Sequence, residues 1–89
     1  MRAVITVIGK DMVGILAKVS NECAKHNINV LEVTQSILQD MFAMIMMVEI
    51  SGSDVPFTQF AENIGKMGDE MGLSIHAMHE DIFNAMHTI

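Results

Sequence analysis

The chain has 89 residues, which suits a single domain over residues 1–89, and 51% of them are hydrophobic. A domain of this size buries only about 60% of the surface of its unfolded chain, so we expect some apolar surface to meet a second copy. The formal net charge of −6 repels phosphate backbones and anionic lipid, no apolar run approaches the roughly 20 residues that span a bilayer, and strand-like sequence begins at once in place of a leader. We therefore expect a cytoplasmic protein, with no nucleic acid and no membrane among its partners.

Cysteine and methionine are both explained by packing. Cys23 is the single cysteine, which rules out an internal disulfide and a four-cysteine zinc site. Most of the ten methionines fall at periodic apolar positions, where a flexible thioether fills gaps. We interpret both residue types as core and not as metal ligands.

The first half of the chain passes from strand to helix to strand. Residues 2–8 (RAVITVI) are rich in β-branched side chains and stop at Gly9, which predicts a strand and a turn. Residues 28–38 (INVLEVTQSIL) alternate apolar and polar side chains, which predicts a second strand after a left-handed residue at Asn27. A helix over about 12–26 is indicated between them by apolar residues at helical spacing, namely Met12, Ile15, Leu16, Val19 and Cys23.

The second half begins with a short polar break at 39–41 and a strand over 42–50 (FAMIMMVEI), close enough to the preceding strand to form an antiparallel hairpin. Pro56 suits the first turn of a second helix that ends at Gly72. Its apolar positions are Phe57, Phe60, Ala61, Ile64, Met67 and Met71. Residues 73–81 (LSIHAMHED) predict a fourth strand, and residues 82–89 form a tail of undetermined form.

Two glycines, Gly65 and Gly68, lie inside the second predicted helix. Each costs about 1 kcal/mol of helix propensity relative to alanine. Close packing against another element and fraying of the helix would each account for them.

This order of elements predicts an α+β, ferredoxin-like βαββαβ fold: a four-stranded antiparallel sheet with two helices on one face. The strand over 42–50 carries apolar side chains on both faces. The two sets are Phe42, Met44, Met46 and Val48 on one face and Ala43, Ile45 and Met47 on the other. If the helices cover the first set, the second set forms an apolar patch on the open face. This patch either contacts another copy or is part of the apolar surface that proteins commonly expose.

The segment ITVIGKDMVGILAKVS followed by NINVLEVTQS resembles the signature half of ACT domains, small regulatory modules of amino-acid metabolism. The C-terminal run EDIFNAMHTI resembles the ending of short, free-standing bacterial ACT proteins. The resemblance implies a ligand held between two copies, against the loop before the first helix and the start of the second strand. The residues it points to are Asp11, Met12, Val13, Gly14 and Asn29.

The chemistry of these residues suits an amino acid. Free N–H groups at the start of the first helix favour a carboxylate, the Asp11 carboxylate accepts an ammonium group, and the Asn29 amide offers both donors and acceptors. Each residue also has an ordinary structural role. Asp11 is a preferred helix cap, Gly14 would permit close backbone approach by a ligand or a neighbouring subunit, and Asn29 could hydrogen-bond locally.

Other site chemistries find little support. His76 and His79 lie three apart on a predicted strand, which puts their rings on opposite faces and disfavours a shared metal. No hydroxyl has a His or acidic partner at a spacing that local structure would bring together, and no phosphate-binding glycine loop is present, so we expect no enzyme and no cofactor. The net charge of −6 argues against an RNA-recognition domain of the same strand order, which needs aromatic residues and basic surroundings. The single cysteine argues against a metal chaperone, which needs paired cysteines.

We therefore predict a non-catalytic, homodimeric domain that senses an amino acid or a similar metabolite and acts on a protein partner in trans. The alternative is a ligand-free dimerisation or protein-interaction module that uses the sheet face around Ala43, Ile45 and Met47 or the edge of the second strand.

Overall fold

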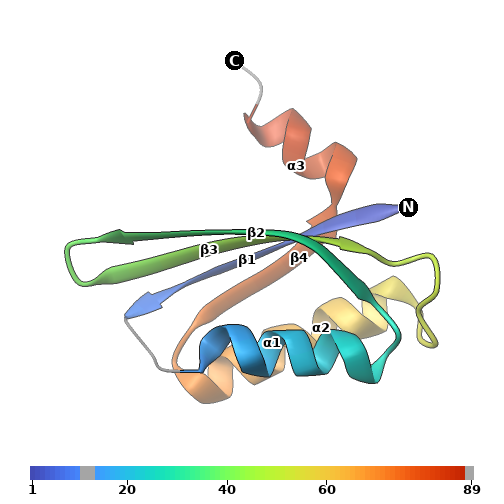
Figure 1. The fold of residues 1–89 in the computed structure, drawn as a ribbon, viewed down its shortest axis with the longest axis horizontal. Helices are drawn as coiled ribbons and strands as arrows, with labels where there is room; N and C mark the ends of the chain where they lie inside the picture. The colour runs from blue at the N-terminus through green and yellow to red at the C-terminus, as the bar shows by residue number, and fades with distance from the viewer. Residues whose placement is uncertain (11–13, 88–89) are drawn as a thin grey trace.

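Seven strands and helices follow one another in the computed structural model, which describes residues 1–10 and 14–87 (Figure 1). They are β1 (Arg2–Lys10), α1 (Ile15–Lys25), β2 (Asn29–Leu38), β3 (Met41–Glu49), α2 (Phe57–Met71), β4 (Ser74–His79) and α3 (Glu80–His87). The four strands form one sheet in the order β2-β3-β1-β4, and every neighbouring pair is antiparallel. Helices α1 and α2 lie together on one face of this sheet (Figure 1). The predicted ferredoxin-like α+β fold is confirmed.

The first boundaries differ from the predicted ones by a few residues. Strand β1 continues through Gly9 to Lys10, because both residues still pair with β3. Helix α1 begins at Ile15 and not at Met12, which lies outside the described residues. Asn27 has the predicted left-handed backbone, with φ of 58°.

The predicted hairpin joins β2 to β3. Its turn consists of Gln39, whose φ is 59°, and Asp40, so that Leu38 pairs directly with Met41. Met41 therefore belongs to the strand and not to the break.

The core lies between the sheet and the two helices. The predicted alternation of β3 is confirmed, since Phe42, Met44, Met46 and Val48 are buried against the helices. On the opposite face Ile45 is 40% exposed. The rest of the core comes from β1, α1, α2 and β4, chiefly Ala3, Ile5, Val7, Ile15, Val19, Cys23, Phe60, Ile64 and Ile75.

Close packing explains Gly68. A Cβ atom at this position would lie 2.7 Å from Cγ1 of Ile75, so α2 can approach β4 only because the side chain is absent. At Gly65 the nearest atom, the Ile75 carbonyl oxygen, would be 3.8 Å away, which is ordinary contact. Helix α2 runs without interruption past both glycines to Gly72, as predicted.

The predicted fourth strand is confirmed, but it is shorter than the predicted range of 73–81, and the tail whose form was left open is largely a helix. Strand β4 ends at His79, its last residue paired with β1, and α3 begins at Glu80. Two acidic residues, Glu80 and Asp81, occupy its first turn, where the helix dipole favours them. The Arg2 guanidinium also binds the Glu80 carboxylate, with Nη2 to Oε2 at 2.7 Å and Nε to Oε1 at 3.1 Å.

Helix α3 stands on the sheet face opposite α1 and α2 (Figure 1). Val4 shows the effect, because it points away from the main core and yet has no exposed surface. The face expected to be bare is therefore covered at one end. None of the helices within residues 1–10 and 14–87 is long and apolar enough to cross a membrane.

Candidate functional site

Gly14 is the N-cap of α1, not a residue of its first turn. Its backbone is left-handed, with φ of 85°, a conformation that glycine adopts without strain. A Cβ atom there would meet nothing described within 4 Å, so the backbone angle, and not crowding inside the chain, accounts for the glycine. Asp11, Met12 and Val13 lie outside the described residues.

The first turn of α1 begins with N–H donors that have no partner inside the helix. The first backbone bond of the helix runs from the Lys18 N–H to the Gly14 carbonyl oxygen, at 3.0 Å. The N–H groups that precede Lys18 have no acceptor one turn back within the helix, and Gly14 has no side chain with which to cap them. This helix end can therefore accept an anionic group.

Asn29 is exposed at the first position of β2, where it pairs with Glu49 of β3. The neighbouring Asn27 makes a hydrogen bond to a distant segment: its Nδ2 donates to the carbonyl oxygen of Gly52 at 3.0 Å. The Asn29 side chain makes no hydrogen bond to any residue that the structure describes, so its amide is available to a ligand.

Glu49, beside Asn29, is held as an anion. Its Oε1 accepts hydrogen bonds from the Met1 amino group at 2.8 Å and from the Ser51 hydroxyl at 2.6 Å and N–H at 3.0 Å. These contacts, the amino group first, lower the pKa of the Glu49 carboxyl from 4.5 to about 2. Beside the start of β2, the Glu49 carboxylate is thus ionised at neutral pH and forms an ion pair with the Met1 amino group.

His26 ties the end of α1 to the loop between β3 and α2. Its Nδ1 lies 2.9 Å from Asp54 Oδ1 and its Nε2 lies 3.2 Å from Glu22 Oε2. The Asp54 N–H also donates to the His26 carbonyl oxygen, at 3.2 Å. This cluster was not predicted from the sequence. The four-residue spacing of Glu22 and His26 could have indicated their contact, but no nearby sequence pattern predicted the contact with Asp54.

A single chain does not bring Gly14 and Asn29 together. Asn29 is level with Glu49 and, across β3, with Arg2 at the start of β1. Gly14 follows the other end of β1, and the eight steps from Arg2 to Lys10 span about 27 Å. The two candidate residues thus lie near opposite ends of α1.

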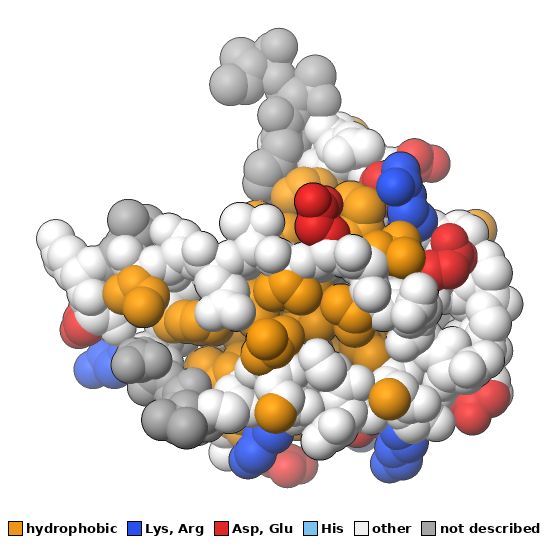
Figure 2. Space-filling view, viewed as in Figure 1, with side chains coloured by type: hydrophobic (Ala, Val, Ile, Leu, Met, Phe, Trp, Pro, Cys, Tyr) orange, Lys and Arg blue, Asp and Glu red, His pale blue; other side chains and the backbone are white. Residues whose placement is uncertain are grey.

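The edge of the domain between these ends is apolar. Strand β2 is a terminal strand of the sheet, so its outer backbone groups have no partner strand within the described chain. Figure 2 shows hydrophobic side chains gathered in a strip between β2 and α1. Exposed members of this edge are Leu16, Leu31 and Ile37, at 36%, 47% and 64% exposure.

The two strand histidines do lie on opposite faces, as predicted. His76 pairs with Thr6 on the open face, whereas the His79 ring packs on Phe57 of α2 with a centroid distance of 4.5 Å. Among the described residues, no cluster of three or more His, Cys, Asp or Glu side chains could hold a metal.

Two local pairs contradict the expectation that no hydroxyl has a His or acidic partner nearby: the Ser51 hydroxyl donates to Glu49, and the Ser74 hydroxyl lies beside His76. Ser74 Oγ and His76 Nε2 are 3.0 Å apart, because residues two apart on a strand share a face. Both side chains are exposed, and no described carboxylate bonds to the other ring nitrogen. The pair lacks the third group that orients the base in a catalytic triad.

Comparison with known proteins places this geometry in a family. The sequence profile of the ACT domain matches residues 2–78. A UPF0237 protein of Listeria innocua is 47% identical over 89 residues, which cover 100% of both chains. The structure of an ACT domain protein from Streptococcus pneumoniae has a TM-score of 0.80 and 30% identity, covering 100% of this chain and 97% of that chain. The ligand-free regulatory subunit of aspartate kinase from Thermus thermophilus has a TM-score of 0.65 and 25% identity over 85% of this chain and 49% of that chain.

The profile spans all four strands and both helices of the main core, and the relatives match along the whole chain. The fold, the order of elements and the sequence all match the same family. The chain belongs to the ACT domain family, whose members are in general regulatory domains that bind small ligands.

Proposed function

We propose that this chain is a non-catalytic regulatory domain that binds an amino acid or a similar zwitterion between two copies. The observation that carries the proposal is the position of Gly14 and Asn29 near opposite ends of α1. In two copies related by a two-fold axis through the middle of α1 and β2, the Gly14 end of one helix meets the Asn29 end of the other. Such a dimer has two equivalent sites.

The edge between β2 and α1 supports this arrangement. An exposed terminal strand and the apolar side chains of Leu16, Leu31 and Ile37 are costly to leave in water. Pairing the two β2 strands would satisfy their outer backbone groups and cover these side chains.

The proposed ligand contacts are polar and few. The free N–H groups at the start of α1 bind the carboxylate, the Asp11 carboxylate binds the ammonium group, and the Asn29 amide of the second copy bridges the two. Backbone groups of Met12 and Val13 complete the ligand contacts made by this loop. The output is a changed contact with a protein partner in trans.

Titration with the common amino acids, followed by amide NMR and by thermal shift, tests the proposal. We expect one amino acid to move resonances of residues 9–15 and 27–30 and to raise the melting temperature. Asn29→Ala should weaken its binding by roughly 10- to 100-fold, because a hydrogen bond to a charged group contributes about 1.5–3 kcal/mol.

The matched control is Asn63→Ala, which removes the same side chain from α2, where it bonds only to Gln59 among described residues. Asn63→Ala should bind the amino acid with the same affinity as the unmodified chain. If no amino acid moves any resonance of these two segments, the sensing proposal is wrong. The ligand-free assembly module, which the apolar β2 edge also supports, would then be the better account.

A further inference from the structure

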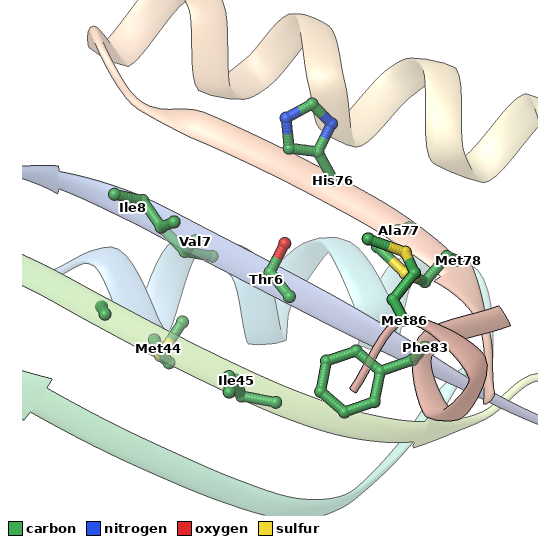
Figure 3. Close-up of a pocket in the computed structure, with 11 residues that line it drawn as sticks. Thr6, Val7, Ile8, Met44, Ile45, His76, Ala77, Met78, Phe83 and Met86 are labelled. Atoms are coloured by element: carbon green, nitrogen blue, oxygen red, sulfur yellow. The ribbon is translucent and has the colours of Figure 1, made fainter. Parts of the chain in front are cut away.

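The open face of the sheet carries a hollow beside α3. Its volume is about 570 Å³, and its lining includes Thr6, Ile8, Ala43, Ile45, Phe83 and Met86. Figure 3 shows Phe83 reaching from α3 over β1 and β3, while Met86 lies toward β4. Helix α3 thus forms one wall, and the strands form the floor.

The covered and uncovered parts of this face lie at opposite ends. Val4 is fully buried at the α3 end, whereas Ile8, four residues further along β1, is 47% exposed. The hollow therefore continues into a bare half of the sheet, which no described residue covers.

The centre of this face carries no Asp, Glu, Lys or Arg side chain. Strand pairing places its residues in adjoining rows, namely Thr34, Ser36, Ala43, Ile45, Thr6, Ile8, Ser74 and His76. Charged residues occur only toward its margins, such as Lys10, Glu32 and Arg2. An uncharged centre with a charged rim is the anatomy of a protein interface, and it lets two chains of net charge −6 meet without placing like charges together.

Helix α3 offers a matching projection. It has eight residues, too few for a stable isolated helix, and it depends on burial of its apolar side. Even so, Ile82 is 53% and Met86 66% exposed. A hollow and an apolar projection on the same face form a self-complementary surface.

We propose that this face binds a second copy of the chain, with α3 of each copy lying over the bare half of the other sheet. A two-fold axis through the hollow carries α3 from the Val4 end of one copy to the Ile8 end of the next. Met86 of each copy then contacts Ile8 and Ala43 of its partner, which closes the hollow.

The available area is that of a small interface. Four strands about 4.8 Å apart, over the six-residue length of β4, give a face of roughly 400 Å², and α3 already covers one half of it. The bare half and the outer side of α3, which measures about 120 Å², give two copies together roughly 640 Å², the size of a small contact.

This contact is separate from the β2 edge of the proposed ligand dimer. A chain that uses both would form a tetramer, and a chain that uses only the face would form a dimer. Failure of one contact leaves the other untouched, so the two proposals can be tested apart.

Cross-linking tests the contact directly. Ile8→Cys protein is mixed with isotopically heavy Met86→Cys protein and oxidised, and the mixed dimer is measured by mass spectrometry. Cys23 is buried and should not interfere. We expect the 8–86 mixed dimer to exceed by at least tenfold the yield with Thr58→Cys, a control on the exposed side of α2. Equal yields would overturn the proposal, including the case in which the face serves a different protein.

A charge substitution gives the second test. Ile45→Lys should halve the mass measured by light scattering at tens of micromolar, whereas Thr58→Lys, which adds the same charge on α2, should leave it unchanged. A circular dichroism spectrum like that of the unmodified chain shows that the variant is folded. A mass that Ile45→Lys leaves unchanged, or an unmodified chain that is already monomeric, contradicts the proposal. The variant Leu31→Lys addresses only the β2 edge, and the 8–86 cross-link should survive it.

Discussion

Replacing the two interior glycines of α2 with alanine should change stability in opposite directions. Both substitutions add a methyl group to the same helix and gain about 1 kcal/mol of helix propensity. They differ in what the methyl group meets. At position 65 the nearest atom is 3.8 Å away, so Gly65→Ala should stabilise the fold by about 0.5–1 kcal/mol.

At position 68 three atoms of Ile75, namely Cγ1, Cβ and Cδ1, lie 2.7, 3.0 and 3.1 Å from the added Cβ. Ile75 is 4% exposed, so its side chain has no solvent to move into. Overpacking of this kind costs about 1–3 kcal/mol. After the gain in propensity, Gly68→Ala should destabilise the fold by about 1 kcal/mol, which lowers the melting temperature by roughly 4–8 °C.

Urea unfolding followed by circular dichroism, at one fixed chain concentration, measures both effects. A double-mutant cycle with Ile75→Ala adds a check, because the pair should be less destabilising than the sum of its parts. Equal stability of Gly68→Ala and Gly65→Ala, or a cycle without coupling, would contradict the packing of Gly68 against Ile75.

Three further predictions concern titratable groups. Burial first, and Glu22 second, raises the pKa of the Cys23 thiol from 9.0 to about 11, so a thiol reagent at pH 8 should label it only after denaturant is added. The pKa of Glu49 is lowered from 4.5 to about 2 in the folded chain, so its stabilising effect is present above pH 4.5 and is lost as the pH falls toward 2. Thermal melts of the unmodified chain and Glu49→Gln should therefore differ at pH 6 and converge near pH 2, and a constant difference would contradict this. His26→Ala removes contacts to two carboxylates and should cost about 1–2 kcal/mol in urea unfolding, whereas a change below a few tenths would show that the cluster is structurally idle.

The strands and helices of the main core were readable because their signals are local. Alternation over 42–50 and helical spacing over 57–71 depend only on which face of one element is buried, and β3 and α2 follow them closely. The signals at Asn27 and Gly72 were also local, because each depends on the left-handed backbone angles of a single residue.

The candidate site was only half visible in the sequence. The resemblance to ACT domains singled out Gly14 and Asn29, but their separation along α1 follows from the pairing of β2, β3 and β1. The His26 cluster also depended on distant residues, since Asp54 reaches it from the loop after β3. Contacts between segments far apart in sequence leave no periodic trace.

The order of the four strands and the two core helices, the face that each buries and the family could be predicted from the sequence, because these depend on neighbouring residues and on a signature of local motifs. The helix over residues 80–87 became visible only in the tertiary structure, since a helix of eight residues depends on the packing of its apolar side against the sheet. The tertiary structure also showed that close packing against Ile75 requires Gly68, and that Gly14 and Asn29 lie at opposite ends of one domain. These features arise from the packing of whole elements, and the geometry of that packing exists only once the sheet has formed.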